Sequence, residues 1–340
     1  MSVNKESVGL TKKDFASDQI VRWCPGCGDY AILAQVQSLL PELGRPPEQY
    51  AFISGIGCAS RFPYYMNTYG FHSIHGRAPT IATGLKAANP ELSVWVVTGD
   101  GDALSIGGNH LIHAMRRNVD IKILLFDNRV YGLTKGQYSP TSRYGQKTPS
   151  TPWGSIDIPL EPVSIVLASE ATFVARTVDR DLKHMKETFR RAAEHRGTAF
   201  VHILQNCPVF NDGAFQQVTD KEIRDDNILY LEHGAPMVFG KDRNKGFHLR
   251  EGVLEVVDLG DGVSEEDLLV HDETRVDSSV AFALSHLDEI RFPVPLGVFR
   301  AVERPTFEER LHAQVAIARE KIGPGSIEGL LKAADTWEVS

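Results

Sequence analysis

The sequence predicts an α/β fold in which helices cover both faces of a mostly parallel β-sheet, followed by a smaller C-terminal extension. Two observations predict this fold. Short, nearly continuous apolar runs of strand length alternate with stretches whose apolar residues recur at helical spacing. Several apolar runs also end in glycine-rich turns that carry acidic, amide or thiol side chains. Because parallel strands end at a common edge of the sheet, we expect these turns to form a site there.

The predicted elements follow in the order that such a sheet requires. Polar residues 1–20 are expected to form an N-terminal arm. Residues 130–153 show no sustained period and predict a long functional loop. The pattern becomes more polar after about residue 220, which predicts a core domain over 21–220 and an appended extension over 221–340. Helices are predicted over 29–40, 79–88, 108–116, 182–194 and 307–321, and strands over 50–53, 92–98, 121–126, 173–176 and 199–204.

Composition narrows the class of protein. The 340 residues are 42% hydrophobic, which is enough for a substantial core. The formal net charge of −8 argues against a partner such as DNA or RNA, whose phosphates require neutralisation. The sequence has no apolar run long enough to span a bilayer, and its N-terminus lacks the apolar core of a signal peptide. We therefore expect a cytoplasmic protein.

Two neighbouring strand ends predict a site for a magnesium diphosphate. Asp100 stands between two glycines directly after one predicted strand, and Asn128 follows the next. Their side-chain oxygens, with a backbone carbonyl near Val130, are the hard donors that Mg²⁺ prefers. The helix that begins after Gly107 and Gly108 can bind phosphate through its free N–H groups. This pattern makes thiamine diphosphate chemistry the leading interpretation, although two ordinary acidic turns with Asp100 as a helix cap also fit.

All four cysteines lie in turns that contain glycine or proline: Cys24, Cys27, Cys58 and Cys207. Four are too few for a disulfide framework in a chain of this size. The Cys-x-x-Cys pair alone fits a redox dithiol, half a zinc site or half an iron–sulfur site. A site with four thiolate ligands uses the whole set, and the wide separation of the last two favours a [4Fe-4S] cluster over zinc. Four unrelated thiols remain the alternative.

These motifs in combination resemble the β subunit of the 2-oxoacid:ferredoxin oxidoreductases, most closely the 2-oxoglutarate type. The resemblance covers roughly residues 15–220 and rests on the following motifs: Cys24-Pro25-Gly26-Cys27-Gly28, Gly55-Ile56-Gly57-Cys58, His75-Gly76-Arg77, Gly99-Asp100-Gly101 with Asn128, Tyr131-Gly132-Leu133-Thr134-Lys135-Gly136-Gln137, and Cys207-Pro208. It implies the three-layer thiamine diphosphate-binding fold.

The resemblance also implies a set of ligands. Cys24, Cys27, Cys58 and Cys207 would bind one [4Fe-4S] cluster, and Asp100, Asn128 and the Val130 carbonyl would hold Mg²⁺. The residues expected around thiamine diphosphate are Ile56, Gly57, Cys58, Ala59, His75, Gly76, Arg77, Gly101, Asp102, Gly132, Leu133 and Thr134.

The implied activity is the oxidative decarboxylation of a 2-oxoacid to acyl-CoA and CO2, or the reverse carboxylation, with one-electron transfer through the cluster to ferredoxin. The implied partners are coenzyme A, the 2-oxoacid, ferredoxin and an α subunit that completes the thiamine site in a heterodimer or heterotetramer. Two other functions remain open. One is a non-redox thiamine decarboxylase or carboligase, and the other is a zinc-stabilised interaction subunit without catalysis.

Two further side chains are candidates for substrate contacts. Arg61, three residues after Cys58, fits the distal carboxylate of a substrate such as 2-oxoglutarate, or is a plain surface arginine. His75 fits a hydrogen bond to cofactor phosphate or substrate, or simply packs beside Gly76 at a helix start.

Overall fold

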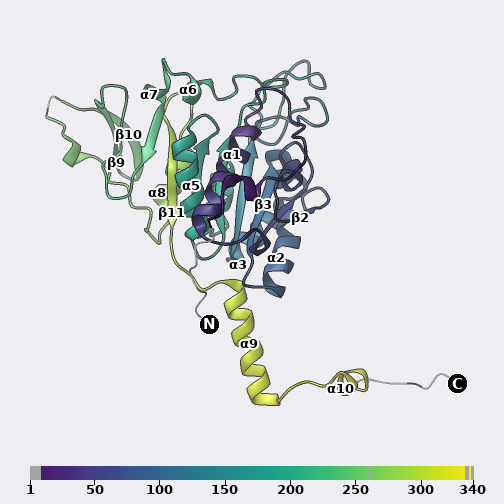
Figure 1. The fold of residues 1–340 in the computed structure, drawn as a ribbon. Helices are drawn as coiled ribbons and strands as arrows, with labels where there is room; N and C mark the ends of the chain where they lie inside the picture. The colour runs from purple at the N-terminus through teal and green to yellow at the C-terminus, as the bar shows by residue number, and fades with distance from the viewer. Residues whose placement is uncertain (1–8, 261, 334–336, 338–340) are drawn as a thin grey trace.

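An eight-stranded β-sheet runs through the centre of the molecule in the computed structural model, which describes residues 9–260, 262–333 and 337 (Figure 1). The strand order is β2-β1-β3-β4-β6-β5-β11-β7. Its strands are β1 (Tyr50–Ser54), β2 (Tyr69–His72), β3 (Ser93–Gly99), β4 (Ile121–Asp127), β5 (Phe173–Val178), β6 (Ala199–Leu204), β7 (Ile228–Leu231) and β11 (Val294–Ala301).

The sheet is mostly parallel, as the sequence predicts. Strands β2, β1, β3, β4, β6 and β5 are parallel to one another, whereas β11 pairs antiparallel with β5 and parallel with β7. Strands β7 and β11 come from the part of the chain after residue 220, where the sequence suggested an appended segment. Residues 294–300 are all buried, so this apolar run completes the sheet rather than standing apart from it.

Helices cover both faces of the sheet and make three layers (Figure 1). One face packs against α1 (Asp29–Leu39) and α5 (Leu182–Glu194). The other packs against α2 (Ala78–Ala88), α3 (Gly108–Arg117), α4 (Pro162–Ala168) and α8 (Ser279–Ser285).

Successive residues of one strand serve opposite faces of the sheet. In β3, Val94 and Val96 join the core under α2 and α3, and Trp95 and Val97 join the core under α1 and α5. A strand buried on both sides favours apolar residues at most positions, which explains the nearly continuous apolar runs in the sequence.

The predicted helices and strands of the first 220 residues are all present, with ends within about two residues of those expected. The sequence does not predict helix α4, the short helix Gln216–Thr219 or strand β2. All four residues of β2 are exposed at the edge of the sheet, and this strand therefore has no apolar run to reveal it. Residues 128–161, between β4 and α4, contain no regular helix or strand, in agreement with the predicted long loop.

The chain after residue 220 adds peripheral elements beside β7 and β11. A small antiparallel sheet consists of β8 (Val238–Phe239), β9 (Lys245–Arg250) and β10 (Val253–Asp258). Helix α9 (Phe307–Ile322) projects away from the body and leads to α10 (Ile327–Leu331) (Figure 1). The short helices α6 (Gln216–Thr219) and α7 (Arg224–Asn227) precede β7. Among the residues that the structure describes, no helix has the length and apolar character needed to cross a membrane.

Candidate active site

Four adjacent strands deliver the predicted ligands to one edge of the sheet. Strands β1, β3, β4 and β6 lie side by side and are parallel, so their C-terminal ends share that edge. Cys58 follows β1, Asp100 follows β3, Asn128 follows β4 and Cys207 follows β6. The strand order therefore places in one row four loops that are far apart in the sequence.

Most of the residues expected around thiamine diphosphate line a cavity of about 110 Å³ at this edge. Four of its lining residues are glycines, which let backbone N–H groups approach a diphosphate closely. Gly101 must lack a side chain because an added Cβ would lie 2.1 Å from the ring of Tyr131. The lining residues are Ile56, Gly57, Cys58, Ala59, His75, Gly99, Asp100, Gly101, Asp102, Phe126, Asn128, Val130, Tyr131, Gly132, Leu133 and Thr134.

Asp102 holds three of the cavity loops together. Its buried Oδ1 accepts hydrogen bonds from the backbone N–H groups of Ile56 (3.1 Å) and Gly76 (2.7 Å), and contacts His75 Nδ1 at 2.5 Å. Its Oδ2 accepts a hydrogen bond from Thr98 Oγ1 (2.6 Å) at the end of β3. With Nδ1 of His75 directed at the carboxylate, the other ring nitrogen is left for contacts in the cavity.

A second buried network holds Asp100. Its Oδ2 accepts hydrogen bonds from Ser139 Oγ (2.5 Å) and Thr141 Oγ1 (2.7 Å), and Thr141 Oγ1 also lies 2.8 Å from Oδ1 of Asp127. Burial, followed by the nearby charge of Asp127, raises the pKa of Asp100 above its ordinary value. The buried carboxyl groups of Asp100 and Asp127 share a hydrogen-bond partner in Thr141. A divalent cation beside them would compensate their negative charge.

Asp127 is in turn fixed from the neighbouring strand. His202 Nε2 lies 2.8 Å from Asp127 Oδ2, and Arg176 Nε donates a hydrogen bond to His202 Nδ1 at 3.1 Å. Because Nδ1 accepts, the proton of a neutral His202 is on Nε2 and is donated to Asp127. Although burial opposes it, this hydrogen bond from His202 lowers the pKa of Asp127.

Asn128 and Val130 lie on the same cavity wall as Asp100. The Val130 N–H donates a hydrogen bond to Asn128 Oδ1 at 3.2 Å, and Asn128 Nδ2 donates to Gln205 Oε1 at 3.0 Å. Arg129 between them has a φ of +58°, so the backbone makes a tight turn directly after β4. The three residues predicted to hold Mg²⁺ are thus brought together in one place.

The four cysteines line a single second cavity of about 250 Å³. A Cβ added at Gly132 would lie 3.5 Å from Sγ of Cys58 and 3.9 Å from Sγ of Cys207, so both sulfurs face the same glycine. The turn of Cys24 and Cys27 is tied to the Cys207 loop by a hydrogen bond from Gly28 N to Asn206 O (3.2 Å).

The chemistry of the four thiols fits an iron–sulfur cluster. Burial, then the charges of Asp29, Cys207 and Cys24, raises the pKa of Cys58 to about 12. Four thiolates this close repel one another unless a positively charged group lies between them. In the described part of the chain, no three His, Cys, Asp or Glu side chains are arranged around a single metal ion. Because all four cysteines line one cavity, their thiols fit a cluster that would lie within it.

The two cavities share a wall. Cys58, Asn128, Gly132 and Leu133 line both of them. A group bound by the four thiols would therefore lie directly beside a cofactor in the glycine-lined cavity.

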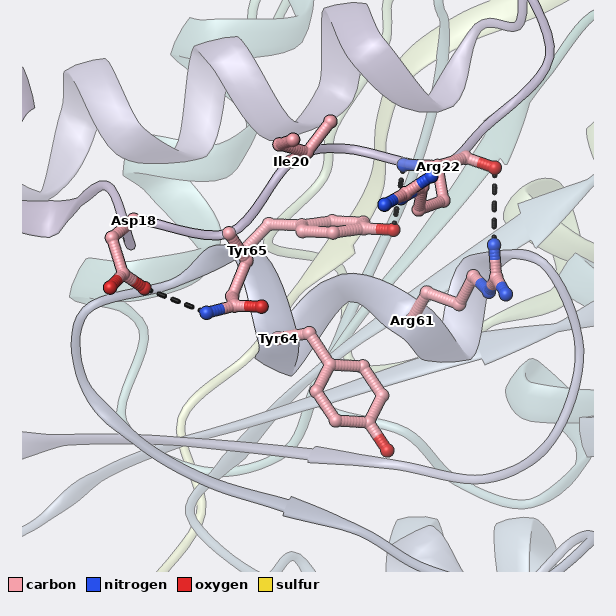
Figure 2. Close-up of a pocket in the computed structure, with 7 residues that line it drawn as sticks. Asp18, Ile20, Arg22, Arg61, Tyr64 and Tyr65 are labelled. Carbon is pink, nitrogen blue, oxygen red and sulfur yellow. Dashed lines mark hydrogen bonds between the residues drawn. The ribbon is translucent and has the colours of Figure 1, made fainter.

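Besides Cys24, Cys27 and Cys207 of the cysteine cavity, three predicted site residues lie outside the glycine-lined cavity. Gly76 does not line the cavity, but its N–H donates a hydrogen bond to Asp102, which does. Arg77 Nη1 donates a hydrogen bond to the backbone carbonyl of Ile106 at 3.2 Å. Arg61 lines the cysteine cavity and also a pocket of about 490 Å³ on the protein surface (Figure 2). Its Nη1 donates a hydrogen bond to the backbone carbonyl of Arg22 at 3.1 Å.

Sequence reasoning missed the residues that support this site. Ser139, Thr141, Asp127 and His202 bond to Asp100 or to each other, and Thr98 bonds to Asp102. The hydroxyl-rich segment 139–142 inside the predicted functional loop was the available signal for the first two. No local pattern distinguishes His202 from an ordinary strand residue.

Comparison with known proteins agrees with this geometry. Residues 55–203 match the family described as the thiamine pyrophosphate enzyme, C-terminal TPP binding domain. The chain is 54% identical over 330 residues to the 2-oxoglutarate oxidoreductase subunit KorB of Mycobacterium tuberculosis, covering 96% of this chain and 88% of that protein. It is 45% identical over 203 residues to the 2-oxoacid:ferredoxin oxidoreductase subunit beta of Saccharolobus solfataricus, covering 59% of this chain and 67% of that one.

The chain belongs to the β subunits of the 2-oxoacid:ferredoxin oxidoreductases. A solved structure extends the similarity to almost the whole β subunit. The 2-oxoglutarate:ferredoxin oxidoreductase from Magnetococcus marinus, with 2-oxoglutarate, coenzyme A and succinyl-CoA bound, matches with a TM-score of 0.76 and 32% identity. The match covers 98% of this chain and 100% of that chain. The β subunit thus has the predicted thiamine diphosphate-binding fold and is part of a multi-subunit oxidoreductase.

Proposed function

We propose that this β subunit and an α subunit together convert 2-oxoglutarate, coenzyme A and two oxidised ferredoxins to succinyl-CoA, CO2, one proton and two reduced ferredoxins. The choice of 2-oxoglutarate is supported by the name of the Mycobacterium tuberculosis relative and by the ligands of the Magnetococcus marinus structure. The observation that carries the proposal is the wall shared by the glycine-lined cavity and the cysteine cavity.

In this proposal each cavity has one cofactor. Asp100, Asn128 and the Val130 carbonyl hold Mg²⁺ on the diphosphate, and the four cysteines bind a [4Fe-4S] cluster. When bound, thiamine diphosphate supplies the electron sink for decarboxylation, and the cluster accepts electrons one at a time. The chain's own residues fix the geometry: Asp102 holds the loops of Ile56 and His75 around the diphosphate.

The size of the glycine-lined cavity supports a partner subunit. Its volume of about 110 Å³ is well below the roughly 300–1,000 Å³ of complete small-molecule sites. We propose that the α subunit supplies the opposite wall, including the carboxylate that activates the aminopyrimidine ring of the cofactor.

Substitution of Cys207 tests the proposed electron route. In anaerobically purified heteromer, C207S removes one cluster ligand, and we expect loss of most iron and of ferredoxin reduction. Release of CO2 from 2-oxoglutarate in a single turnover should persist, because that step needs only the thiamine cavity. Iron content, visible absorption and radiolabelled CO2 release measure the three effects.

Val209→Ser is the matched control, since Val209 is an exposed residue of the same loop and offers no thiol. It should retain iron and both activities. A C207S heteromer that still reduces ferredoxin at the normal rate would refute the cluster assignment. A colourless, iron-free wild-type protein would instead favour the non-redox thiamine enzyme.

A further inference from the structure

The charged side chains around the mouth of the cysteine cavity are all basic. Among the described residues that line it, Arg22, Arg61 and Lys135 are charged and none is acidic. We call these three residues the basic rim. The whole chain has a formal net charge of −8, so this local excess of positive charge opposes the overall sign. A surface of this kind attracts an acidic partner.

Exposed apolar side chains and a cysteine line the same cavity as the basic rim. Leu133 is 50% exposed and Phe210 is 38% exposed, and both line the cavity mouth. Cys24 is itself exposed, two residues after Arg22. Apolar contacts at the centre with charges around them are typical of protein docking surfaces.

Hydrogen bonds to neighbouring segments fix the backbone that carries Arg22 and the side chain of Arg61. The hydrogen bond from Arg61 Nη1 to the Arg22 carbonyl joins two rim residues, as Figure 2 shows. The Arg22 N–H donates a hydrogen bond to the Tyr65 hydroxyl at 2.9 Å, and Trp23 Nε1 donates one to the Cys58 carbonyl at 2.7 Å. The segment that carries Arg22 is thereby fixed directly against the loop of Cys58.

We propose that the basic rim is the docking surface for a small acidic one-electron carrier protein. This proposal rests on the proposed function, because it requires a cluster between the four thiols. In each docking event one electron passes from the reduced cluster to the oxidised carrier, which leaves in its reduced form. No bond is formed or broken and no proton moves, and two such events remove the two electrons from each 2-oxoacid.

The exposed position of Cys24 supports an electron carrier as the partner that docks on the basic rim. A carrier that docks on the rim stands directly over a cluster ligand, so electron transfer requires no rearrangement of the chain. Complexes of electron-transfer proteins have small interfaces and depend strongly on salt, as expected for attraction between opposite charges. The α subunit and a second copy of this chain are the other occupants that an experiment must distinguish.

The test is charge reversal in the complete heteromer. In the R22E/K135E variant, we expect the Kd for an acidic two-cluster bacterial ferredoxin to rise by about 10-fold or more at low salt. The KM for ferredoxin should rise in parallel, and the salt dependence of binding should flatten. Arg61 is left unchanged because a contact with the substrate carboxylate is a separate proposal for it.

Three measurements separate docking from loss of the site. Iron content, thiamine diphosphate binding and 2-oxoglutarate-dependent reduction of methyl viologen, a small cationic acceptor, should stay within about twofold of the wild type. The control K241E/R250E makes the same change in net charge at exposed residues outside the cysteine cavity, and its ferredoxin affinity should not change.

An unchanged ferredoxin Kd in R22E/K135E would overturn the proposal. Failure of this variant to assemble with the α subunit would also overturn it, because the rim would then belong to the subunit interface. A wild-type heteromer without iron or methyl viologen reduction would instead show that the proposed function itself had failed.

Discussion

Asp102 shows how one buried side chain sets the shape of a cofactor cavity. Its carboxylate makes hydrogen bonds or close contacts with four groups, which come from two other loops and a strand end. Removing such an acceptor leaves buried backbone N–H groups unpaired, which costs about 1–3 kcal/mol for each group. Gly55 packs against this carboxylate so closely that an added Cβ would lie 2.0 Å from Oδ2.

We expect Asp102→Ala in the heteromer to weaken binding of magnesium thiamine diphosphate by about 10- to 100-fold, the usual effect of losing a residue that supports a ligand shell. Asp102→Asn should have a smaller effect because its amide oxygen still accepts hydrogen bonds. Calorimetric titration measures both affinities. Asp14→Asn, at an exposed acid, is the control. Binding by Asp102→Ala within twofold of the wild type would contradict this role.

At the scale of elements, a buried charge cluster ties α2 to the start of β4. Asp120 lies 2.9 Å from Lys86 Nζ and 2.8 Å from Lys122 Nζ, and the two lysine side chains are only 7% and 6% exposed. Although burial opposes it, the charges of Lys122 and Lys86 lower the pKa of Asp120 below its ordinary value. A buried ammonium group is costly without its counter-charge, so the carboxylate matters more than a surface ion pair.

Asp120→Asn should lower the free energy of unfolding by about 2–4 kcal/mol at pH 7, because it removes the carboxylate that pairs directly with two buried ammonium groups. Since the folded pKa is depressed, this contribution is fully present above pH 3.8 and is lost as the pH falls further. The difference between wild type and variant in urea unfolding should therefore shrink in strong acid.

The control for this prediction is Asp225→Asn. Asp225 pairs with Arg224 at the surface, where both side chains are largely exposed, so the change should be below about 0.5 kcal/mol. Equal destabilisation by the two substitutions at pH 7 would count against a special role for the buried cluster.

At the scale of the whole molecule, the β subunit presents an incomplete site. The row of loops after β1, β3, β4 and β6 forms one wall of a cofactor cavity, and helix α9 extends away from the body instead of covering it. This architecture agrees with our proposal that the α subunit completes the active site.

We expect the purified β subunit alone to produce no succinyl-CoA from 2-oxoglutarate, because the wall that we propose for the α subunit is missing. Addition of the α subunit should restore CoA-dependent ferredoxin reduction, measured spectrophotometrically under anaerobic conditions. Full turnover by the isolated β subunit would contradict a site shared between subunits.

Local patterns in the sequence determined the elements of the core and the identity of the candidate ligands. The strands from β1 to β6 within the first 220 residues, other than β2, are continuous apolar runs because they are buried on both faces. Asp100, Asn128 and the four cysteines could be singled out because they follow or precede such elements in glycine- or proline-rich turns.

Only the tertiary structure decided which of these residues meet. Strand order is set by packing across the whole chain and no local period encodes it, so the sequence did not show that β11 joins the sheet. A common site for Cys24 and Cys207 was expected from the use of the whole cysteine set and from the family resemblance, and the structure places both in one cavity. The structure likewise showed that Asp102 binds two other loops and that Arg61 lies beside Arg22, since hydrogen bonds between distant segments exist only after the sheet has assembled.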